Sequence, residues 1–456
     1  MLPLILLACT EPTPSTPSSG DSAVRTNDTG DEGFEVLDVD AELADIVTVV
    51  RVRWSTEVET TGYVEFGFDE SYGKLTNTTE SGTEHEVLLL GMPADTPVHF
   101  RVVASDGANE VSSEALDITT GPLPSGSPTL TVEGEVDGQW AYQAIPFQGT
   151  SYVIAIVDTE GRIVWYDFPE PKGNLMRALV TPEFDEVVYV WAGSQDFLDE
   201  GKIVRVSMDG SERTEIDFPY VDHDAAILPN GVLAGIVVTE PPEDSGYDEH
   251  DRADRIVELA PDGTQTTIWN AWDHIDFSAI PSIRNEHNYT HANGLDYVAE
   301  EDAYYISLKT LGTIAKVDRS TGETLWMVNG ELNEFSFPEG TEIVQLQHQF
   351  DRVDGGLLIF DNGERDRGYS RAVEYALDEE NLEGEQVWEY IHDPPIQVLV
   401  KGDVSRFDDG TTQVVWSLAG EIQNVTPEGE VYWQLNTDLG QALTFVQVLD
   451  DLYARP

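Results

Sequence analysis

Three histidines hold comparable places in the second half of the chain, and they are the residues best suited to chemistry. His223, His291 and His348 each open a predicted strand that lies close to a glycine-containing turn. Neutral imidazole is both a nucleophile and a proton carrier near neutral pH. A single histidine at such a place could equally be a core residue whose ring bonds a backbone carbonyl. Three at equivalent places, from only nine in the chain, favour a shared centre.

The most informative of these contexts runs from 345 to 375. His348 precedes an apolar stretch, an Asp354-Gly355 turn and a second apolar stretch that closes at Gly363. An alternating stretch then begins after Ser370. Apolar runs on either side of a D-G turn predict a β-hairpin, and the alternation predicts a third strand. This histidine would therefore stand on the first strand of a sheet.

A repeated pattern predicts the elements that must position the histidines. A glycine turn, three residues and an aromatic or apolar anchor recur at intervals of roughly fifty residues, the length of one four-stranded propeller blade. Each glycine would supply the positive φ of a hairpin turn, and each Trp would wedge between neighbouring blades. The sequence therefore predicts an all-β, six-bladed β-propeller. The copies are Gly161 to Trp165, Gly322 to Trp326, Gly384 to Trp388 and Gly429 to Trp433, with looser copies at Gly210 to Ile216 and Gly263 to Trp269.

The first strand of a propeller blade is the innermost one and lines the central channel. The three histidines would then converge on one axis from three different blades. The other six histidines lie in predicted connecting segments or on strands of an N-terminal domain, where structural roles are expected. They are His85, His99, His250, His274, His287 and His392.

These motifs together resemble the arylsulfate sulfotransferase family, bacterial enzymes that move a sulfuryl group between phenols without a nucleotide donor. The similarity covers about residues 125 to 456. The family's H-x-N motif is similar to His291-Ala292-Asn293, and its H-D and L-P-N-G motifs to His223-Asp224 and Leu228 to Gly231. Its Q-H, F-D-N-G and S-R-x-V-E-Y motifs match Gln347-His348, Phe360 to Gly363 and Ser370 to Tyr375.

The resemblance implies roles for individual residues. His348 would be the nucleophile that becomes sulfated, while His223 and His291 would bind sulfate oxygens or handle the phenol proton. Lys309 stands where the family's motif has arginine. Lysine keeps the positive charge but lacks the planar fork that grips two sulfate oxygens at once. Lys309 is therefore either a sulfate contact or a solvated strand lysine.

Two further residues of the matched motifs are candidates for substrate binding. Asn293 belongs to the H-x-N motif. Arg371 belongs to the S-R-x-V-E-Y stretch, where it is either an anion contact or a strand arginine paired with an acidic neighbour. Both would add donors or positive charge around the oxygens of an aryl sulfate.

The implied reaction suits these residue types. A sulfuryl group passes through a loose, in-line transition state with charge on its equatorial oxygens, as a phosphoryl group does. An imidazole that takes up the group forms a covalent intermediate, which a second phenol discharges in a ping-pong sequence. The expected partners are an aryl sulfate donor and a phenolic acceptor. No cofactor and no metal are expected.

The charge of the chain limits its partners. The 86 acidic and 24 basic residues give a formal charge of −62, which excludes a general nucleic-acid binder and argues against an electrostatic membrane surface. Long-range steering of an anionic sulfate ester is also unfavourable. Any such binding must therefore come from local cations and desolvated donors.

The N-terminal residues predict export and a lipid anchor. Residues 1–9 are apolar and end in Leu6-Leu7-Ala8-Cys9, which resembles a bacterial lipobox with Cys9 as the lipidated residue. Residues 10–33 are rich in Pro, Ser, Thr and Gly and predict a disordered tether. The expected location is the periplasm or the cell surface, with membrane contact through the lipid alone.

A separate β domain is predicted between the tether and the propeller. Residues 34–121 alternate in short strands and, with Trp54, resemble a fibronectin type III or immunoglobulin-like sandwich. Residues 122–130 form a Pro-, Ser- and Gly-rich linker, and residues 131–456 form the propeller.

Two other functions stay open at this point. The protein could be a non-catalytic, surface-tethered propeller that binds a partner, with Lys309 as a trace of lost activity. It could also be a metal-dependent propeller hydrolase, since His287 and His291 are four residues apart. That spacing suits a helix, whereas the segment predicts loop and strand. The natural donor and acceptor and the oligomeric state are not determined by the sequence.

Overall fold

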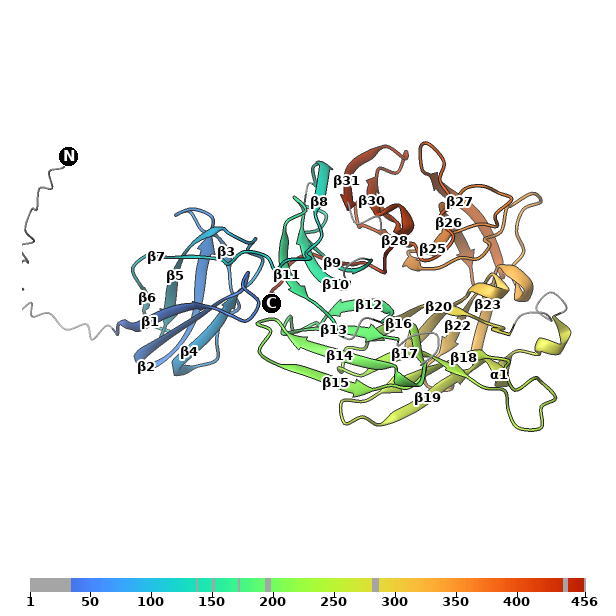
Figure 1. Ribbon diagram of the computed structural model, residues 1–456, viewed down its shortest axis with the longest axis horizontal. Helices are drawn as coiled ribbons and strands as arrows, with labels where there is room; N and C mark the ends of the chain where they lie inside the picture. The colour runs from blue at the N-terminus through green and yellow to red at the C-terminus, as the bar shows by residue number, and fades with distance from the viewer. Residues whose placement is uncertain are drawn as a thin grey trace, which may run out of the picture.

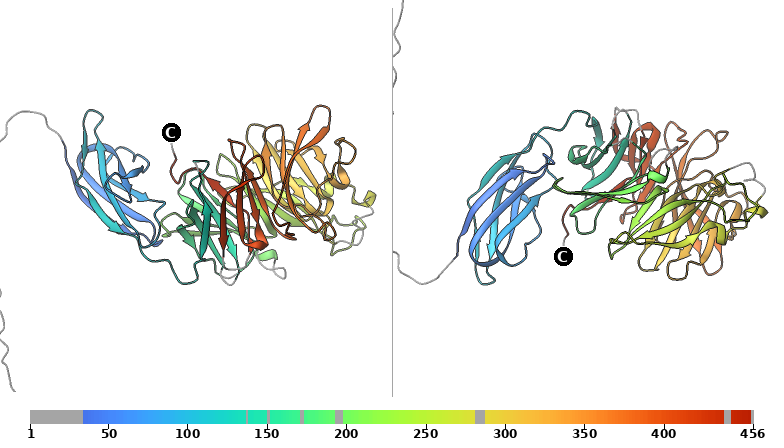
Figure 2. Two further views of the ribbon diagram at one scale, coloured as in Figure 1. Left: turned by 90° about the horizontal axis from the view of Figure 1, so that it is seen from above. Right: turned by 60° about the horizontal axis from the view of Figure 1, so that its bottom comes forward.

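A computed structural model describes residues 34–136, 138–149, 152–170, 173–192, 198–280, 287–437 and 442–454. Six β-sheets stand around a central axis, and a smaller β domain lies beside them (Figures 1 and 2). The predicted all-β, six-bladed propeller is confirmed. No helix in the described part of the chain is long and apolar enough to cross a membrane. Residues 1–33, with the predicted lipobox and tether, lie outside the described residues.

The N-terminal domain is built around one long strand, β2 (Val50–Gly67). Its first half pairs with β1 (Val36–Leu43) and β4 (Gly82–Leu89), and its second half pairs with β3 (Gly73–Leu75) and β5 (Pro97–Ser105). Two short strands, β6 (Glu110–Ser112) and β7 (Leu116–Thr119), complete the β5 side. One strand thus joins two sheets. The resemblance of this domain to fibronectin type III stays a prediction.

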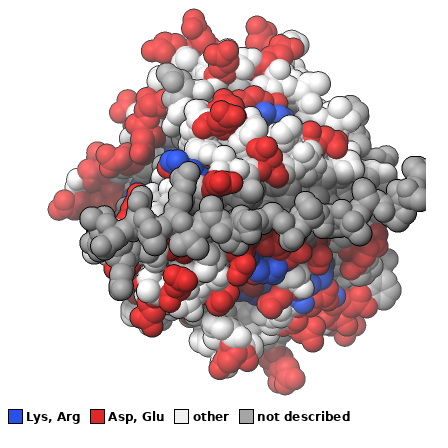
Figure 3. Space-filling model, turned by 90° about the vertical axis from the view of Figure 1, so that its left-hand side faces the viewer, with Lys and Arg blue, Asp and Glu red and all other residues white. Residues whose placement is uncertain are grey.

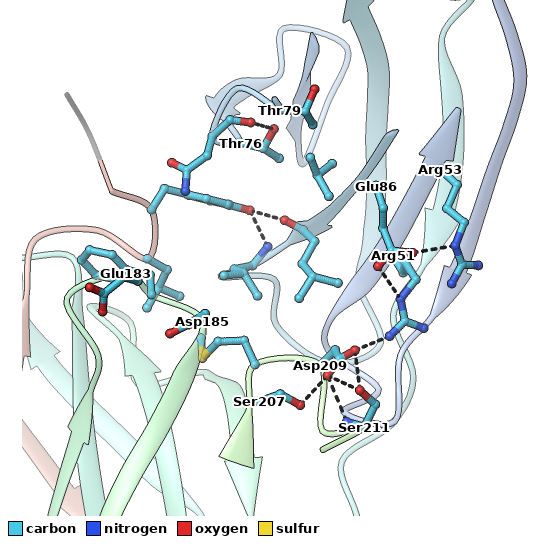
Figure 4. A pocket seen from close by; sticks show the side chains of 18 of the residues that line it. Arg51, Arg53, Thr76, Thr79, Glu86, Glu183, Asp185, Ser207, Asp209 and Ser211 are labelled. Atoms are coloured by element: carbon cyan, nitrogen blue, oxygen red, sulfur yellow. Dashed lines mark hydrogen bonds and ion pairs between the residues drawn. The ribbon is translucent and has the colours of Figure 1, made fainter. Parts of the chain in front are cut away.

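The two domains share a continuous hydrophobic core and several polar contacts. Arg51 forms an ion pair with Asp209 of the propeller (Figure 4). The hydroxyl of Thr48 donates to the carbonyl of Val164 at 2.7 Å, so the contact extends along the domain edge. A cavity of about 690 Å³ lies at this junction, and none of the three histidines lines it.

Five blades are four-stranded meanders in chain order, innermost strand first, with a fifth strand added to the last of them. Blade 1 is β12 (Leu175–Val180), β13 (Glu186–Trp191), β14 (Lys202–Ser207) and β15 (Arg213–Asp217). Blade 2 is β16 (Val221–Ile227), β17 (Leu233–Thr239), β18 (Ala253–Leu259) and β19 (Gln265–Asn270). Blade 3 is β20 (Ala292–Val298), β21 (Ala303–Leu308), β22 (Thr313–Asp318) and β23 (Thr324–Val328). Blade 4 is β24 (Phe350–Val353), β25 (Gly356–Asp361), β26 (Arg371–Asp378) and β27 (Glu383–Ile391). Blade 5 is β28 (Asp403–Arg406), β29 (Thr412–Trp416), β30 (Glu421–Val425) and β31 (Val431–Thr437).

Blade 6 is assembled from both ends of the propeller. Its outer strands are β9 (Tyr142–Gln148), β10 (Tyr152–Asp158) and β11 (Ile163–Asp167), and its innermost places are taken by β32 (Ala442–Leu443) and β33 (Gln447–Leu449). The preceding strand β8 (Leu130–Gly134) instead extends the outer edge of blade 5, beside β31. Strands from the two ends of the propeller sequence therefore close the ring.

The tryptophans of the repeat connect neighbouring blades, as predicted. The indole nitrogen of Trp433 in blade 5 donates to the carbonyl of Thr159 in blade 6 at 2.9 Å, and that of Trp165 in blade 6 donates to Met208 of blade 1 at 3.0 Å. The prediction that every repeat glycine supplies a positive φ is wrong for Gly384. This glycine lies inside β27, where a Cβ would come within 2.4 Å of the Phe337 ring, so close packing explains it.

Short helical turns connect some of the strands. One of them, the 3₁₀ turn η4 (Lys309–Leu311), bears on the site described below. The others are η1 (Leu198–Glu200), α1 (Ala271–His274), η2 (Phe277–Ala279), η5 (Gly330–Leu332) and η6 (Ser417–Ala419).

Acidic side chains are spread over the surface. On the face of the N-terminal domain shown in Figure 3, Asp and Glu are widely scattered and few Lys or Arg are visible. Several of the basic residues are engaged in ion pairs, such as Arg53 with Glu42 and Glu86. Such a surface repels anions, so a site for a sulfate ester depends on cations gathered locally.

Candidate active site at one mouth of the propeller channel

The three histidines meet at one end of the channel. The innermost strand is the first strand of each of blades 2, 3 and 4, so these strands start at the same end of the propeller. His223 lies near the start of β16, His291 directly before β20 and His348 two residues before β24. The rings of His223 and His291 are 5.1 Å apart between centroids, and positive charge on either of them lowers the pKa of His348. The predicted convergence is therefore what the structure shows.

His348 lies slightly outside the strand on which it was predicted. Strand β24 begins at Phe350, but the backbone pairing continues beyond it. The amide of Phe360 donates to the carbonyl of Gln349 at 2.8 Å, and the amide of His348 donates to the carbonyl of Phe360 at 3.1 Å. The imidazole is thus fixed to blade 4 by an extension of the β24–β25 ladder, and it is only 3% exposed.

The hydrogen bonds of Asn362 determine the tautomer of His348. The Asn362 side-chain nitrogen donates to the carbonyls of Val398 and Lys401, at 2.7 and 2.8 Å, so its oxygen must face the imidazole. That oxygen lies 2.7 Å from Nδ1 of His348 and accepts the Nδ1 proton. Nε2 therefore keeps its lone pair. This is the arrangement that a nucleophilic imidazole needs.

Burial and nearby charge keep His348 neutral. Burial lowers its pKa well below the ordinary value, although the hydrogen bond that Nδ1 donates to Asn362 opposes this effect. Positive charge on His223, Lys309 and His291 lowers the pKa of His348 further. A neutral ring at neutral pH carries the free lone pair that attack on sulfur requires.

The two other histidines have opposite protonation tendencies. Burial, with positive charge on His223 and Lys309, lowers the pKa of His291 to about 3. Burial also disfavours the charged form of His223, but the Asp222 carboxylate 3.0 Å from its Nδ1 outweighs this and raises the pKa of His223 above its ordinary value. His223 therefore favours the cationic form more than an ordinary histidine does, and His291 favours the neutral form.

The backbone at these histidines is strained. His223 has φ 51° and His291 has φ 43°, in the left-handed region that non-glycine residues rarely occupy. The pairing of β16 with β17 and of β20 with β21 shifts by a bulge at the same places. Strain and bulges of this kind are concentrated at functional sites, where they turn a side chain toward a ligand.

Lys309 is not a strand residue, contrary to the sequence prediction. Strand β21 ends at Leu308, and Lys309 begins the 3₁₀ turn η4, which closes at Gly312 with φ 65°. The turn carries the lysine to the mouth of the channel, where its charge lowers the pKa of both His291 and His348. Lys309 therefore belongs to the histidine cluster.

Asn293 is fully buried and forms a hydrogen bond with the backbone next to the nucleophile. Its side-chain nitrogen donates to the carbonyl of Gln347 at 2.9 Å, and its oxygen accepts from the hydroxyl of Ser307 at 3.1 Å. Both ends of the amide are thus occupied by protein groups. The residue predicted to bind substrate instead holds the backbone next to His348.

Arg371 is paired with acidic neighbours, which is the second of the two roles that the sequence left open. It is 2% exposed, and its guanidinium contacts Asp361 and Glu389, each at 2.9 Å. It also donates to the carbonyl of Glu342 at 2.9 Å. These acceptors lie on blade 4 and the segment before it, so Arg371 stabilises the blade that carries His348.

A buried carboxylate cross-links the segments that carry the site. Asp224, next to His223, accepts from Arg177 of blade 1 at 2.8 Å and from Gln349, next to His348, at 2.6 Å. The sequence alone does not predict this role for the Asp224 carboxylate. Asp224 appeared only as part of the H-D motif, and its partners lie 47 and 125 residues away in the chain.

Two site residues were missed altogether. The sequence pattern indicates only the end of a strand and a turn at Asn362, although its place in the F-D-N-G motif is a usable signal. Lys401 lies in a loop before β28, with φ 60°, and its carbonyl is one of the two that hold Asn362. No motif marks it in the sequence. The only nearby signal is the adjacent Gly402, a residue type that accommodates the positive φ found at this place.

The geometry gives no support to a metal centre. Among the described residues, no group of three or more His, Cys, Asp or Glu side chains is arranged to hold a metal ion. Nδ1 of His287 lies 3.0 Å from Asp251, and His291 belongs to the separate cluster in the channel. The two histidines of the predicted four-residue spacing thus have different partners.

Solved propeller structures are similar to this chain at low identity. A streptogramin B lyase is 14% identical with a TM-score of 0.38, covering 68% of this chain and 98% of that one. A putative 6-phosphogluconolactonase from Bacteroides fragilis is 10% identical with a TM-score of 0.41, covering 86% and 98%. A periplasmic gluconolactonase from Pseudomonas aeruginosa is 10% identical with a TM-score of 0.40, covering 68% and 99%. With such scores, the fold assignment depends on the strand order of this chain itself.

Comparison with protein families is more specific. No curated protein matches the chain. A family model described as arylsulfotransferase (ASST) matches residues 143–394, which is more than half of the chain and includes His223, His291 and His348. The chain belongs to the arylsulfotransferase family.

Proposed function

We propose that the protein transfers a sulfuryl group from an aryl sulfate to a phenol through a sulfated His348. The observation that supports this most strongly is the fixed tautomer of His348, since the Asn362 amide leaves Nε2 as the free nitrogen. Around it stand His223, whose pKa is raised, the neutral His291 and Lys309, groups that suit an anion with a reactive centre. Family membership supports the same general activity.

The first half-reaction is an in-line displacement at sulfur. The lone pair of His348 Nε2 forms an N–S bond while the S–O bond to the aryl group breaks, and the electron pair leaves with the phenolate oxygen. His223 and Lys309 stabilise the negative charge on the equatorial oxygens. The product is a sulfated imidazolium that keeps its proton on Nδ1, and this N–H donates to the oxygen of Asn362.

The second half-reaction reverses this displacement with a new phenol. The acceptor oxygen attacks sulfur while its proton passes to a neutral base at the site, and the N–S bond breaks as its electron pair returns to Nε2. Asn362 is important here because a neutral amide cannot remove the Nδ1 proton. The imidazole therefore leaves as a neutral ring from a cationic intermediate, which is a better leaving group than an anionic one.

Mixing the protein with 4-nitrophenyl sulfate tests this function directly. Donor alone should give a burst of nitrophenolate and a sulfuryl adduct in the intact mass, and phenol should then discharge the adduct to phenyl sulfate. A chelator should change neither result. A protein that gives no adduct and no phenyl sulfate is a binding propeller, and loss of activity with chelator would indicate a metal-dependent hydrolase.

The pH dependence of adduct formation should reflect the lowered pKa of His348. Because burial keeps this ring neutral well below its ordinary pKa, the rate with 4-nitrophenyl sulfate should change by no more than about twofold between pH 7 and pH 5. Protonation consumes the nucleophile only below that range. Stopped-flow release of nitrophenolate measures the profile. A decline centred near the ordinary histidine pKa would contradict the assignment.

We also propose that the protein is exported and anchored by lipid at Cys9. The wild type should fractionate with membranes, and Cys9→Ser should release it into the soluble fraction, because the lipid would be the anchor. Immunoblots of both fractions measure this, with the activity of each sample as a check on folding. Membrane retention of Cys9→Ser would show that the anchor is elsewhere.

A further inference from the structure

Lys401 completes the ring of polar residues at the channel mouth. Blades 2, 3 and 4 contribute the histidines, and Lys401 comes from the segment that leads into β28 of blade 5. Its φ of 60° places it in the same disfavoured region as His223 and His291. Its charge also acts on His223, whose pKa it lowers. The lysine therefore lies within electrostatic reach of the cluster.

The amine of Lys401 is directed away from its own blade, toward the neighbouring blade 6. Its Nζ donates to the side-chain oxygen of Gln148, the last residue of β9 in blade 6, at 2.7 Å. The side-chain nitrogen of Gln148 in turn donates to the carbonyl of Leu175, the first residue of β12 in blade 1. The amine is thus held at the junction of blades 6 and 1.

This position lies toward the side of the channel opposite the nucleophile. In a ring of six blades, blade 1 faces blade 4, as Figure 1 shows for β12 to β15 and β25 to β27, and blade 6 is next to blade 1. An in-line displacement places the leaving oxygen on the side of sulfur away from the attacking nitrogen. Attack by His348 from blade 4 across the channel directs the leaving oxygen toward blades 6 and 1. His223 and His291, on blades 2 and 3, lie to one side of the line that runs from the attacking nitrogen through sulfur to the leaving oxygen.

We infer that Lys401 is a catalytic residue that protonates the departing phenolate and then accepts the proton of the incoming phenol. This role rests on the proposed sulfuryl transfer. In the first half-reaction an ammonium N–H of Lys401 passes its proton to the phenolate oxygen as the S–O bond breaks. In the second, the neutral amine takes the O–H proton of the acceptor as its oxygen attacks sulfur. The lysine returns to its starting state.

The environment of Lys401 suits both states. Burial lowers its pKa to about 7, so the amine and the ammonium are both present near neutral pH. A general acid and base works best when its pKa is close to the operating pH. Gln148 accepts from the ammonium without neutralising it, whereas a carboxylate would keep the proton on the lysine.

The test compares two donors in Lys401→Gln. Nitrophenolate leaves readily without a proton, whereas phenolate is more basic and depends on an acid. Single-turnover cleavage of phenyl sulfate should fall about 100-fold more than cleavage of 4-nitrophenyl sulfate. Lys309→Gln, the matched lysine variant, should slow both donors by the same factor, because it affects the sulfate oxygens common to both.

Lys401→Arg keeps the experiment decisive if the Gln variant does not fold. Arginine retains the charge and can still donate to Gln148, but it does not release its proton at any pH of the assay. It should show the same selective loss with phenyl sulfate. The alkaline decline that the wild type shows with phenyl sulfate but not with 4-nitrophenyl sulfate should also disappear. The other titratable groups of the mouth, unchanged by this exchange, are Asp222, His223, Asp254, His291, Lys309, His348 and Asp403.

The outcomes separate this inference from the function on which it rests. If the wild type forms no sulfuryl adduct with either donor, the proposed function is wrong and so is the role of Lys401. If the wild type transfers sulfuryl groups but the folded Lys401 variants slow both donors equally, only the role of Lys401 is wrong. Circular dichroism and melting temperature establish that the variants are folded.

Discussion

His348→Asn should reduce cleavage of 4-nitrophenyl sulfate by several orders of magnitude, because it removes the nucleophile while keeping a similar shape. The neighbouring contacts should survive, since the backbone amide of residue 348 still donates to Phe360. Burst kinetics and intact-mass analysis with donor alone measure the effect. The wild type should carry a sulfuryl adduct and the variant none.

His250→Asn is the matched control for this exchange. His250 has an exposed side chain and contacts Asp248, and it is not among the groups that affect His348. This variant should form the adduct at the wild-type rate. An adduct that persists in His348→Asn would show that another residue accepts the sulfuryl group, and the assignment of the nucleophile would be wrong.

Lys309→Ala should slow donor cleavage by about 2–4 kcal/mol in the activation free energy, roughly a hundredfold or more. The expected cause is the loss of one charge-assisted contact to an equatorial oxygen of the transition state. Lys309→Arg should retain activity or raise it, since the guanidinium fork can grip two oxygens. Single-turnover rates measure both changes.

The melting temperature separates a chemical from a structural effect of Lys309. It should change little in either variant, because the residue begins a short 3₁₀ turn at the channel mouth. Lys202→Ala, on β14 of blade 1, is the matched control and should cleave donor normally. If Lys309→Ala turns over donor at the wild-type rate, His223, His291 and Lys401 must supply the sulfate site.

Periodic features of the sequence predicted the fold well. The repeated glycine turns and tryptophans identified six blades because each blade makes the same local contacts, such as Trp433 with Thr159. Closure of blade 6 by β32 and β33 was not predicted. These strands are only two and three residues long, and they pair with β9, about 300 residues earlier. No local sequence pattern therefore predicts them.

The site was predicted only where a motif carried it. The three histidines stand out by their equal places in successive blades. Asn362 and Lys401 act through contacts with other loops, such as the bond from Asn362 to the carbonyl of Lys401, 39 residues away. Arg371 belongs to a matched motif, but its orientation toward Asp361 depends on the packing of blade 4. Motifs identify residue types, whereas their contacts depend on the tertiary fold.

The closure of blade 6 has a consequence for how the protein matures. Gln148, which holds Lys401, lies on β9 opposite Ala442, and Tyr453 beyond it donates to the carbonyl of Leu88 in the N-terminal domain at 2.9 Å. The innermost strands of this blade are therefore synthesised after all the strands of blades 1 to 5. We expect a nascent chain to hold five blades with an open gap, and to acquire its complete active site only once β32 and β33 have emerged from the ribosome.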